Sequence, residues 1–190
     1  MSLPNLEKTF KEHWSLQEMI DVQGSEYLNN LSKKDFLMAV SMRNLRSRGV
    51  DIEKRVIKVN KWESVSGKKE QGDAKNQNRF IEIKSSIITP LKNSSITLRG
   101  MREWEDIDYY CFVIIDYRNF ESGKINDYIF YISRKDLDIE SKKYGLAKKY
   151  NLSEKASKGN KNIPLGINMK IGDKNFKRWE EKFSKHNYKL

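Results

Sequence analysis

The segment that most constrains the fold is Arg79–Ile88, RFIEIKSSII, whose residue types are typical of a β-strand. Successive side chains of a strand point to opposite faces, so Glu82 and Lys84 share one face and the neighbouring isoleucines share the other. Charges on an apolar strand are costly to bury unless they pair with each other or bind a cation. The segment therefore predicts a buried sheet in which one strand holds functional charges.

A second acid, Asp73, precedes this strand across the polar stretch KNQNR, which is typical of a tight turn. A hairpin centred on Gln77 places Asp73 opposite Ile81 and within one residue of Glu82. The two carboxylates are then expected to converge at the sheet edge, beside the Lys84 ammonium group. The alternative interpretation is a solvent-facing edge strand in which Glu82 and Lys84 are incidental neighbours.

Apolar patterning elsewhere predicts helices on both sides of a strand-rich middle. Predicted helices are two short ones within 5–30, one from the Ser32 cap to near Gly49, and others at 50–61, 98–106, Arg134–Tyr144 and after the Asp173 cap; predicted strands are 62–65, Arg79–Ile88, Tyr109–Asp116 and 127–133. This order predicts an α/β fold with a mixed central sheet of four or five strands flanked by helices. No linker of domain-boundary length interrupts it, so a single domain is expected.

The charge balance points to a polyanionic partner. Thirty-seven Lys and Arg against 26 Asp and Glu give a formal net charge of +11, which favours nucleic acid over an anionic membrane surface. The apolar runs are shorter than the roughly 20 residues of a spanning helix, and no signal-peptide pattern is present, so a cytoplasmic location without membrane contact is expected. With one cysteine, Cys111, and two histidines, His13 and His186, no Cys/His zinc site is expected.

Two carboxylates beside a lysine suit phosphodiester hydrolysis. Magnesium prefers oxygen ligands and keeps several waters, so Asp73, Glu82 and the carbonyl of Ile83 are sufficient protein ligands, with Mn²⁺ as a possible substitute. Lys84 is expected to orient or deprotonate the attacking water and to offset charge on the phosphate. No GxxxxGK[ST] loop is present, so ATP is not expected as a partner.

Asp73, followed after eight residues by the triplet EIK at 82–84, resembles the signature of the PD-(D/E)XK nucleases. The wider context resembles a type II restriction endonuclease. RGVDIEKRVIKVNKW at 48–62 is similar to the helix that precedes the site in such enzymes, and ITLRGMREWEDIDYYCFVIID at 96–116 is similar to the helix and second core strand that follow it.

The resemblance implies a restriction-endonuclease-like fold, magnesium dependence, double-stranded DNA as substrate and a homodimer. It divides the single domain 1–190 into a helical N-terminal part (1–49), a catalytic core (50–133) and a helical, basic C-terminal part (134–190). One departure is Gly72, which stands where the family pattern has proline. The alternatives are a nuclease of the same fold in repair, recombination or a mobile element, and a non-catalytic nucleic-acid-binding module.

Glu53 is a further catalytic candidate. In the helix predicted at 50–61, Ile52 and Val56 form the buried face, Arg55 takes the outer side and Glu53 lies at the margin. The family pattern, in which this helix often presents an extra acid, favours a role in holding a second metal or a water. An ordinary surface acid is the alternative.

DNA contacts are predicted beside the site and in the basic C-terminal part. Arg99 and Arg102 suit bidentate phosphate binding, with salt bridges to neighbouring acids as the alternative. Asn160 and Lys161 lie in 142–161, which has seven lysines and one acid, and can contact bases or phosphates unless the segment is only a solvated loop. The candidates beside the site are Lys75, Ser85 and Ser86.

Overall fold

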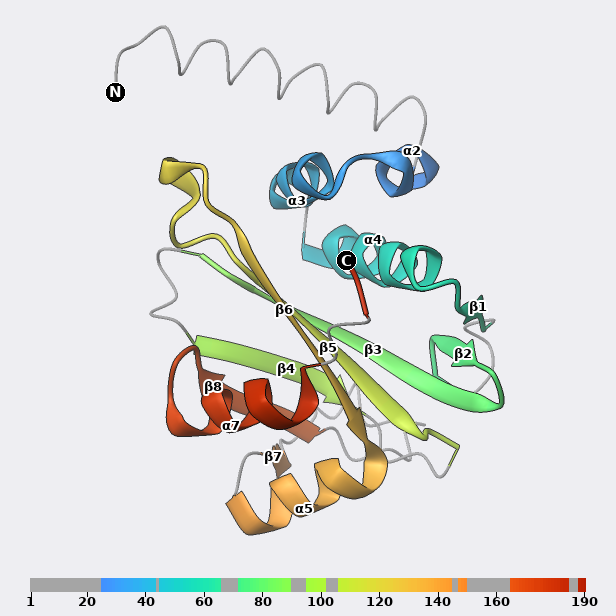
Figure 1. Cartoon of the computed structure of the whole chain (residues 1–190), viewed down its shortest axis with the longest axis vertical. Coiled ribbons are helices and arrows are strands. Elements are labelled where there is room, and N and C mark those ends of the chain that lie inside the picture. Colours follow the sequence, from blue (N-terminus) through green and yellow to red (C-terminus); the bar gives the residue numbers. More distant parts are fainter. Residues whose placement is uncertain are drawn as a thin grey trace, which may run out of the picture.

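The computed structural model describes residues 25–43, 45–65, 72–89, 95–101, 106–144, 147–149, 165–184 and 188–190. Its elements (Figure 1) are α2 (Ser25–Asn30), α3 (Lys33–Met42), α4 (Leu45–Val59), β1 (Glu63–Ser64), β2 (Ala74–Asn76), β3 (Arg79–Ile88), β4 (Ser95–Met101), β5 (Tyr109–Asp116), η2 (Phe120–Ser122), β6 (Asn126–Ser133), α5 (Arg134–Tyr144), β7 (Ala147–Lys149), β8 (Leu165–Lys170) and α7 (Lys174–Phe183). None of the described helices is both long and apolar enough to cross a membrane. Of the two helices predicted within 5–30, residues 5–24 lie outside the described stretches.

A five-stranded sheet forms the centre of the molecule, in the order β1-β2-β3-β5-β6. β1, β2 and β3 are an antiparallel meander, β5 is parallel to β3, and β6 returns antiparallel to β5. The predicted α/β class and mixed sheet are confirmed. The strands predicted at Arg79–Ile88 and Tyr109–Asp116 have the bounds of β3 and β5.

Both faces of the sheet are covered (Figure 1): α2, α3 and α4 lie on one side, and β4, β8, α7 and α5 lie on the other. The alternation of β5 shows how the two apolar clusters form. Cys111 and Val113 belong to the cluster under the helices, whereas Phe112 and Ile114 belong to the cluster on the opposite face. Because β5 is buried on both faces, its sequence is a nearly continuous apolar run.

A second sheet, in the order β4-β8-β7, corrects the first part of the helix predicted at 98–106, since 98–101 lie in β4; residues 102–105 lie outside the described stretches. Ile96 and Leu98 are fully buried on either side of Thr97, a period of two that belongs to a strand. β4 pairs antiparallel with β8, with Ile96 opposite Met169 in the same apolar cluster. The partner strand is distant in the chain, so local composition did not reveal the pairing.

The break between α3 and α4 also differs from the prediction. The Ser32 cap is confirmed, since its Oγ accepts a hydrogen bond from the first turn of α3. The helix ends at Arg43, whose ψ of 156° is extended, and α4 then runs through Gly49 without interruption. Arg48 reaches back from α4 and donates to the Ser41 carbonyl at 2.6 Å, which satisfies one of the free carbonyls at the end of α3.

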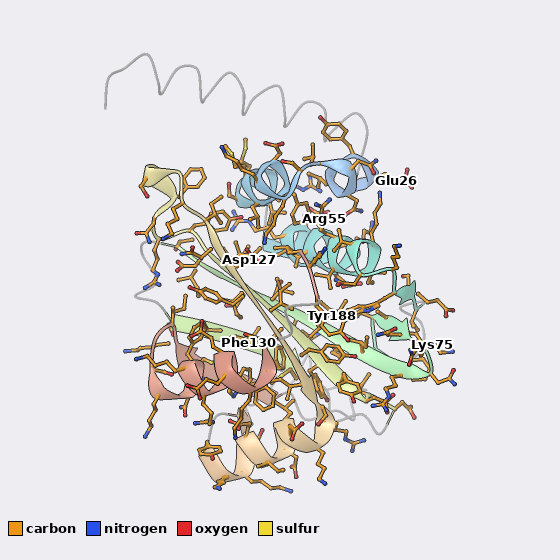
Figure 2. All side chains as sticks on the ribbon, viewed as in Figure 1. Glu26, Arg55, Lys75, Asp127, Phe130 and Tyr188 are labelled. Atoms are coloured by element: carbon orange, nitrogen blue, oxygen red, sulfur yellow. The ribbon has the colours of Figure 1, made fainter. Side chains whose placement is uncertain are left out.

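Arg55 was predicted on the outer side of its helix, and this is wrong (Figure 2). The side chain is 7% exposed because α2 and α3 cover α4 from the side away from the sheet. Its Nη1 donates to the Asn29 carbonyl at 2.6 Å, and its guanidinium lies 5.2 Å from the centre of the Phe36 ring. The N-terminal helices therefore form a polar contact with α4 as well as an apolar one.

Candidate active site

The β2–β3 hairpin places Asp73 level with Glu82. Its two-residue turn has Gln77 at φ 56° and pairs Ala74 with Ile81. The predicted register, with Asp73 opposite Ile81, is therefore wrong by one residue, because the turn centre falls after Gln77 rather than on it. The backbone N–H of Asp73 donates to the Ile81 carbonyl at 2.9 Å, which continues the pairing to the acid itself.

The backbone at Gly72 could not accommodate the proline that the PD-(D/E)XK pattern has at this position. Its φ is +78°, in the left-handed region that proline cannot enter. A Cβ at Gly72 would lie 2.7 Å from the Ile81 carbonyl oxygen and 2.9 Å from the Ile107 side chain. The chain therefore enters β2 through a glycine that lies against β3. This close contact fixes the position of the next residue, Asp73.

The two acids and the lysine predicted to act together are neighbours. Lys84 Nζ forms an ion pair with Glu82 Oε1 and lies 3.9 Å from Asp73 Oδ2. Glu82 is only 7% exposed, so this pair is not on a solvent-facing edge. A buried carboxylate is costly unless it is paired, and Lys84 is the partner of Glu82.

The backbone of Ile83 contacts the carboxylate of Asp73. Its N–H donates to Asp73 Oδ2 at 2.7 Å. The N–H and C=O of one strand residue point to the same edge, so the Ile83 carbonyl faces the side of β3 on which Asp73 lies. The carbonyl predicted as a metal ligand is thus directed toward the acids.

Glu53 joins this group from α4. Burial raises the pKa of its carboxyl to about 7; the carboxylate of Asp73 and, more weakly, that of Glu82 add to the rise, while Lys84 opposes it. These influences place Glu53 near the other three charged groups and distinguish it from an ordinary surface acid. A raised pKa in such a cluster is typical of functional sites.

A pocket of about 410 Å³ opens beside these residues. It lies along the part of β3 that follows the end of the β2 pairing, between α4 and β4. Lys84 and Glu53 are on its wall. The full lining is Arg48, Gly49, Val50, Glu53, Ile83, Lys84, Ser85, Ser86, Ile87 and Thr97.

Sequence reasoning missed five of the lining residues: Arg48, Gly49, Val50, Ile87 and Thr97. Three of them belong to the first half of α4: the prediction placed Arg48 in the preceding helix and Gly49 at its end, and Val50 at the start of the helix at 50–61. Gly49 could have been linked to Glu53 by their spacing in the sequence. The two residues are four apart, so they lie on one face of a helix that runs through both. Thr97 required the recognition of β4 as a strand.

The carboxylate oxygens of Asp73 and Glu82 and the carbonyl oxygen of Ile83 are the kind of ligands that a magnesium ion prefers. Within the described stretches, no three Asp, Glu, His or Cys side chains converge closely enough to bind a metal by themselves. Magnesium needs only one or two carboxylates and retains several waters, and Asp73, Glu82 and the Ile83 carbonyl meet that need. After burial, the neighbouring carboxylates contribute to the raised pKa of Glu53, and these carboxylates also favour a bound cation.

The serines predicted to contact DNA both line the pocket, but in different ways. Ser85 is partly exposed. Ser86 is 7% exposed, and its Oγ accepts a hydrogen bond from the Thr97 N–H at 3.3 Å. Ser86 therefore joins β3 to β4, and Ser85 is the better placed of the two to reach a ligand.

Of the other predicted DNA contacts, Lys75 is the one whose side chain the structure describes, and it is not among the residues that line the pocket. Lys75 lies on β2 at the side of the molecule (Figure 2), with Nζ 5.7 Å from the centre of the Phe80 ring. The backbone of Arg99 is in β4. The Arg99 side chain and residues Arg102, Asn160 and Lys161 lie outside what the structure describes.

Comparison of the chain with protein-family models and with curated proteins gives no match. The function is therefore inferred from the geometry of the site and from the resemblance of its motif.

Proposed function

We propose that the chain is a magnesium-dependent endonuclease that hydrolyses phosphodiester bonds in double-stranded DNA, as a type II restriction enzyme of the PD-(D/E)XK kind does. The observation that supports this most is the meeting of Asp73, Glu82 and Lys84 where the β2–β3 pairing ends. Glu53 and a pocket of about 410 Å³ adjoin them. The proposed fold is restriction-endonuclease-like, and the proposed assembly is the homodimer usual in that family.

Each residue has a distinct part in this proposal. Asp73, Glu82 and the Ile83 carbonyl would hold Mg²⁺, which when bound lowers the pKa of a water and offsets charge on the phosphate. Lys84, directed at both carboxylates, is placed to orient the attacking water and to stabilise the extra negative charge of the transition state. Glu53 is placed to accept a proton from that water, since its pKa of about 7 matches neutral pH.

Cleavage of a long DNA duplex in Mg²⁺ tests the proposal. Discrete fragments are expected for a sequence-specific enzyme, random nicks for a repair or recombination nuclease, and intact DNA for a binding module. Lys84→Ala should lower the cleavage rate by roughly 100-fold or more, because one positive group is lost from the transition state. A Lys84→Ala variant that cuts at the parental rate would remove the lysine from the mechanism.

Asp73→Ala separates chemistry from binding. Cleavage should be lost, while duplex binding measured in Ca²⁺ should be largely kept, because the carboxylate serves the metal more than DNA affinity. Asp138→Ala is the matched control, since Asp138 is an exposed acid on α5 that pairs with Lys142, four residues on. Equal loss of duplex binding and cleavage in Asp73→Ala would argue against a metal ligand.

A further inference from the structure

Gly49 stands inside helix α4, although the surrounding structure does not require a glycine there. Its backbone is helical, so it does not need the left-handed conformations that favour glycine. A Cβ at this position would meet no heavy atom within 4 Å in the described part of the chain. Glycine in a helix is less stable than alanine because it loses more backbone freedom on folding. The fold alone therefore favours alanine at this position.

The space above Gly49 belongs to the pocket of the proposed site. Gly49 and Glu53 are four residues apart on one face of α4, and both line the pocket. The β3 wall of the same pocket contains Lys84 and Ser85. A missing side chain at Gly49 thus enlarges the pocket one helical turn from Glu53.

The two walls of the pocket have different chemistry. The β3 wall presents the Lys84 ammonium and a serine hydroxyl, which suit a phosphate group. The α4 wall is mixed: Gly49 and Val50, which is 44% exposed, form its apolar part, and Glu53 lies one turn further along. Arg48 is already engaged, since its guanidinium donates to backbone carbonyls at the end of α3.

A DNA strand matches this pair of walls. Its phosphates are anionic, and the carbon atoms of its deoxyribose rings are apolar. A phosphate facing Lys84 would direct the adjoining sugar toward α4, where the space above Gly49 is open.

We propose that Gly49 provides clearance for the substrate: the sugar–phosphate backbone of the strand to be cut passes directly over this residue while its phosphate faces Lys84. This inference rests on the proposed nuclease function and adds to it a contact on α4 that lies away from the reacting atoms.

Two substitutions of graded size test the clearance. Gly49→Ala and Gly49→Leu both favour a helix, so neither should lower the midpoint of thermal unfolding. Cleavage and duplex affinity should fall in the order Gly, Ala, Leu, with a roughly 100-fold loss of kcat/KM for leucine, because the strand is displaced from the site. Binding of Mn²⁺ without DNA should stay at the parental affinity.

Lys58→Leu is the matched control, because Lys58 is exposed and nine residues along α4, which turns it to the opposite side of the helix. It should cut DNA at the parental rate. A Gly49→Leu variant that cuts and binds like the parent overturns the inference while the nuclease function stands. Loss of Mn²⁺ binding or a lower unfolding midpoint in Gly49→Leu also overturns it, since the effect would then be structural.

The nuclease function itself can fail separately. If the parental chain binds duplex without cutting it, weaker duplex binding by Gly49→Leu still supports the clearance, and unchanged binding overturns it. If the parental chain neither binds nor cuts duplex DNA, both proposals are overturned.

Discussion

At the scale of the residue, Glu53 shows how the fold changes the chemistry of a single carboxyl group. Its ordinary pKa is 4.5, and burial together with the nearby carboxylates of Asp73 and Glu82 raises it to about 7. Between these two values the unfolded chain releases the proton while the folded chain keeps it. The contribution of Glu53 to stability is therefore fully present below about pH 4.5 and is lost as pH rises to about 7.

Glu53→Gln should remove this contribution to the pH dependence of the free energy of unfolding. In metal-free buffer the variant is expected to be more stable than the parent above pH 7, because it no longer places a charge among carboxylates, and the advantage should disappear toward pH 4.5. Urea unfolding midpoints across this pH range measure the difference. Glu26→Gln on α2 (Figure 2) is the control, since Glu26 is exposed. Parallel pH profiles for the parent and Glu53→Gln would contradict the pKa shift.

At the scale of the element, the β2–β3 hairpin depends on the glycine that precedes it. Gly72 combines a left-handed φ of +78° with a backbone contact from Ile81. Gly123 has a similar φ of +75°, but a Cβ there would meet nothing within 4 Å of the described chain. The two glycines therefore separate the cost of an unfavourable φ from the cost of a close contact.

Gly72→Ala should destabilise the protein more than Gly123→Ala. The left-handed conformation costs an alanine roughly 1–2 kcal/mol at either position, and Gly72→Ala must also move the hairpin away from Ile81. Urea unfolding measures both free energies. Gly72→Ala should further weaken Mn²⁺ binding, because Asp73 is displaced, whereas Gly123→Ala should not. Equal effects of the two substitutions on stability and on Mn²⁺ binding would show that the contact at Gly72 does not position the acid.

The elements that the sequence predicted well are those whose signal is local. β3 and β5 matched their predicted bounds because each has a strong pattern of its own residues. β4 did not, because its burial depends on pairing with β8, far along the chain. Gly49 was interpreted as a helix end, although the break is made at Arg43 by hydrogen bonds from Arg48 that sequence does not show.

The candidate site divides in the same way. The grouping of Asp73, Glu82 and Lys84 followed from the period of a strand and the length of a turn, and an error of one residue in register did not separate them. The wall formed by Gly49 and Val50 could not be predicted, because it depends on where α4 lies against β3.

At the scale of the whole molecule, the net charge of +11 governs the approach of any polyanion. Each phosphate that a protein contacts releases bound counterions, so duplex affinity falls with salt, with a slope of about −0.9 per contact on logarithmic axes. A large part of the charge excess lies in 142–161, with seven lysines and one acid, whereas the proposed phosphate contact at the pocket is the single group Lys84.

Lys84→Ala should reduce the salt slope of duplex binding by about 0.9, because one phosphate contact is lost. Affinities measured in Ca²⁺ at several salt concentrations give the slope. Lys58→Leu, on the far side of α4, removes one positive charge as well but should leave the slope nearly unchanged. A Lys84→Ala slope equal to that of the parent would place the lysine away from the phosphates.

Because the β2 pairing ends early, part of the β3 edge is open to pairing with a strand from another copy of the protein. Beyond Ile81, no strand of the described chain pairs with β3 on the β2 side within the five-stranded sheet. An open strand edge can add a strand from a neighbouring molecule and begin aggregation. Here the Ile83 N–H on that edge already donates to the Asp73 carboxylate at 2.7 Å, so an added strand would have to displace this acid. The Asp73 carboxylate, proposed to hold the metal, is thus also expected to keep this sheet from adding strands.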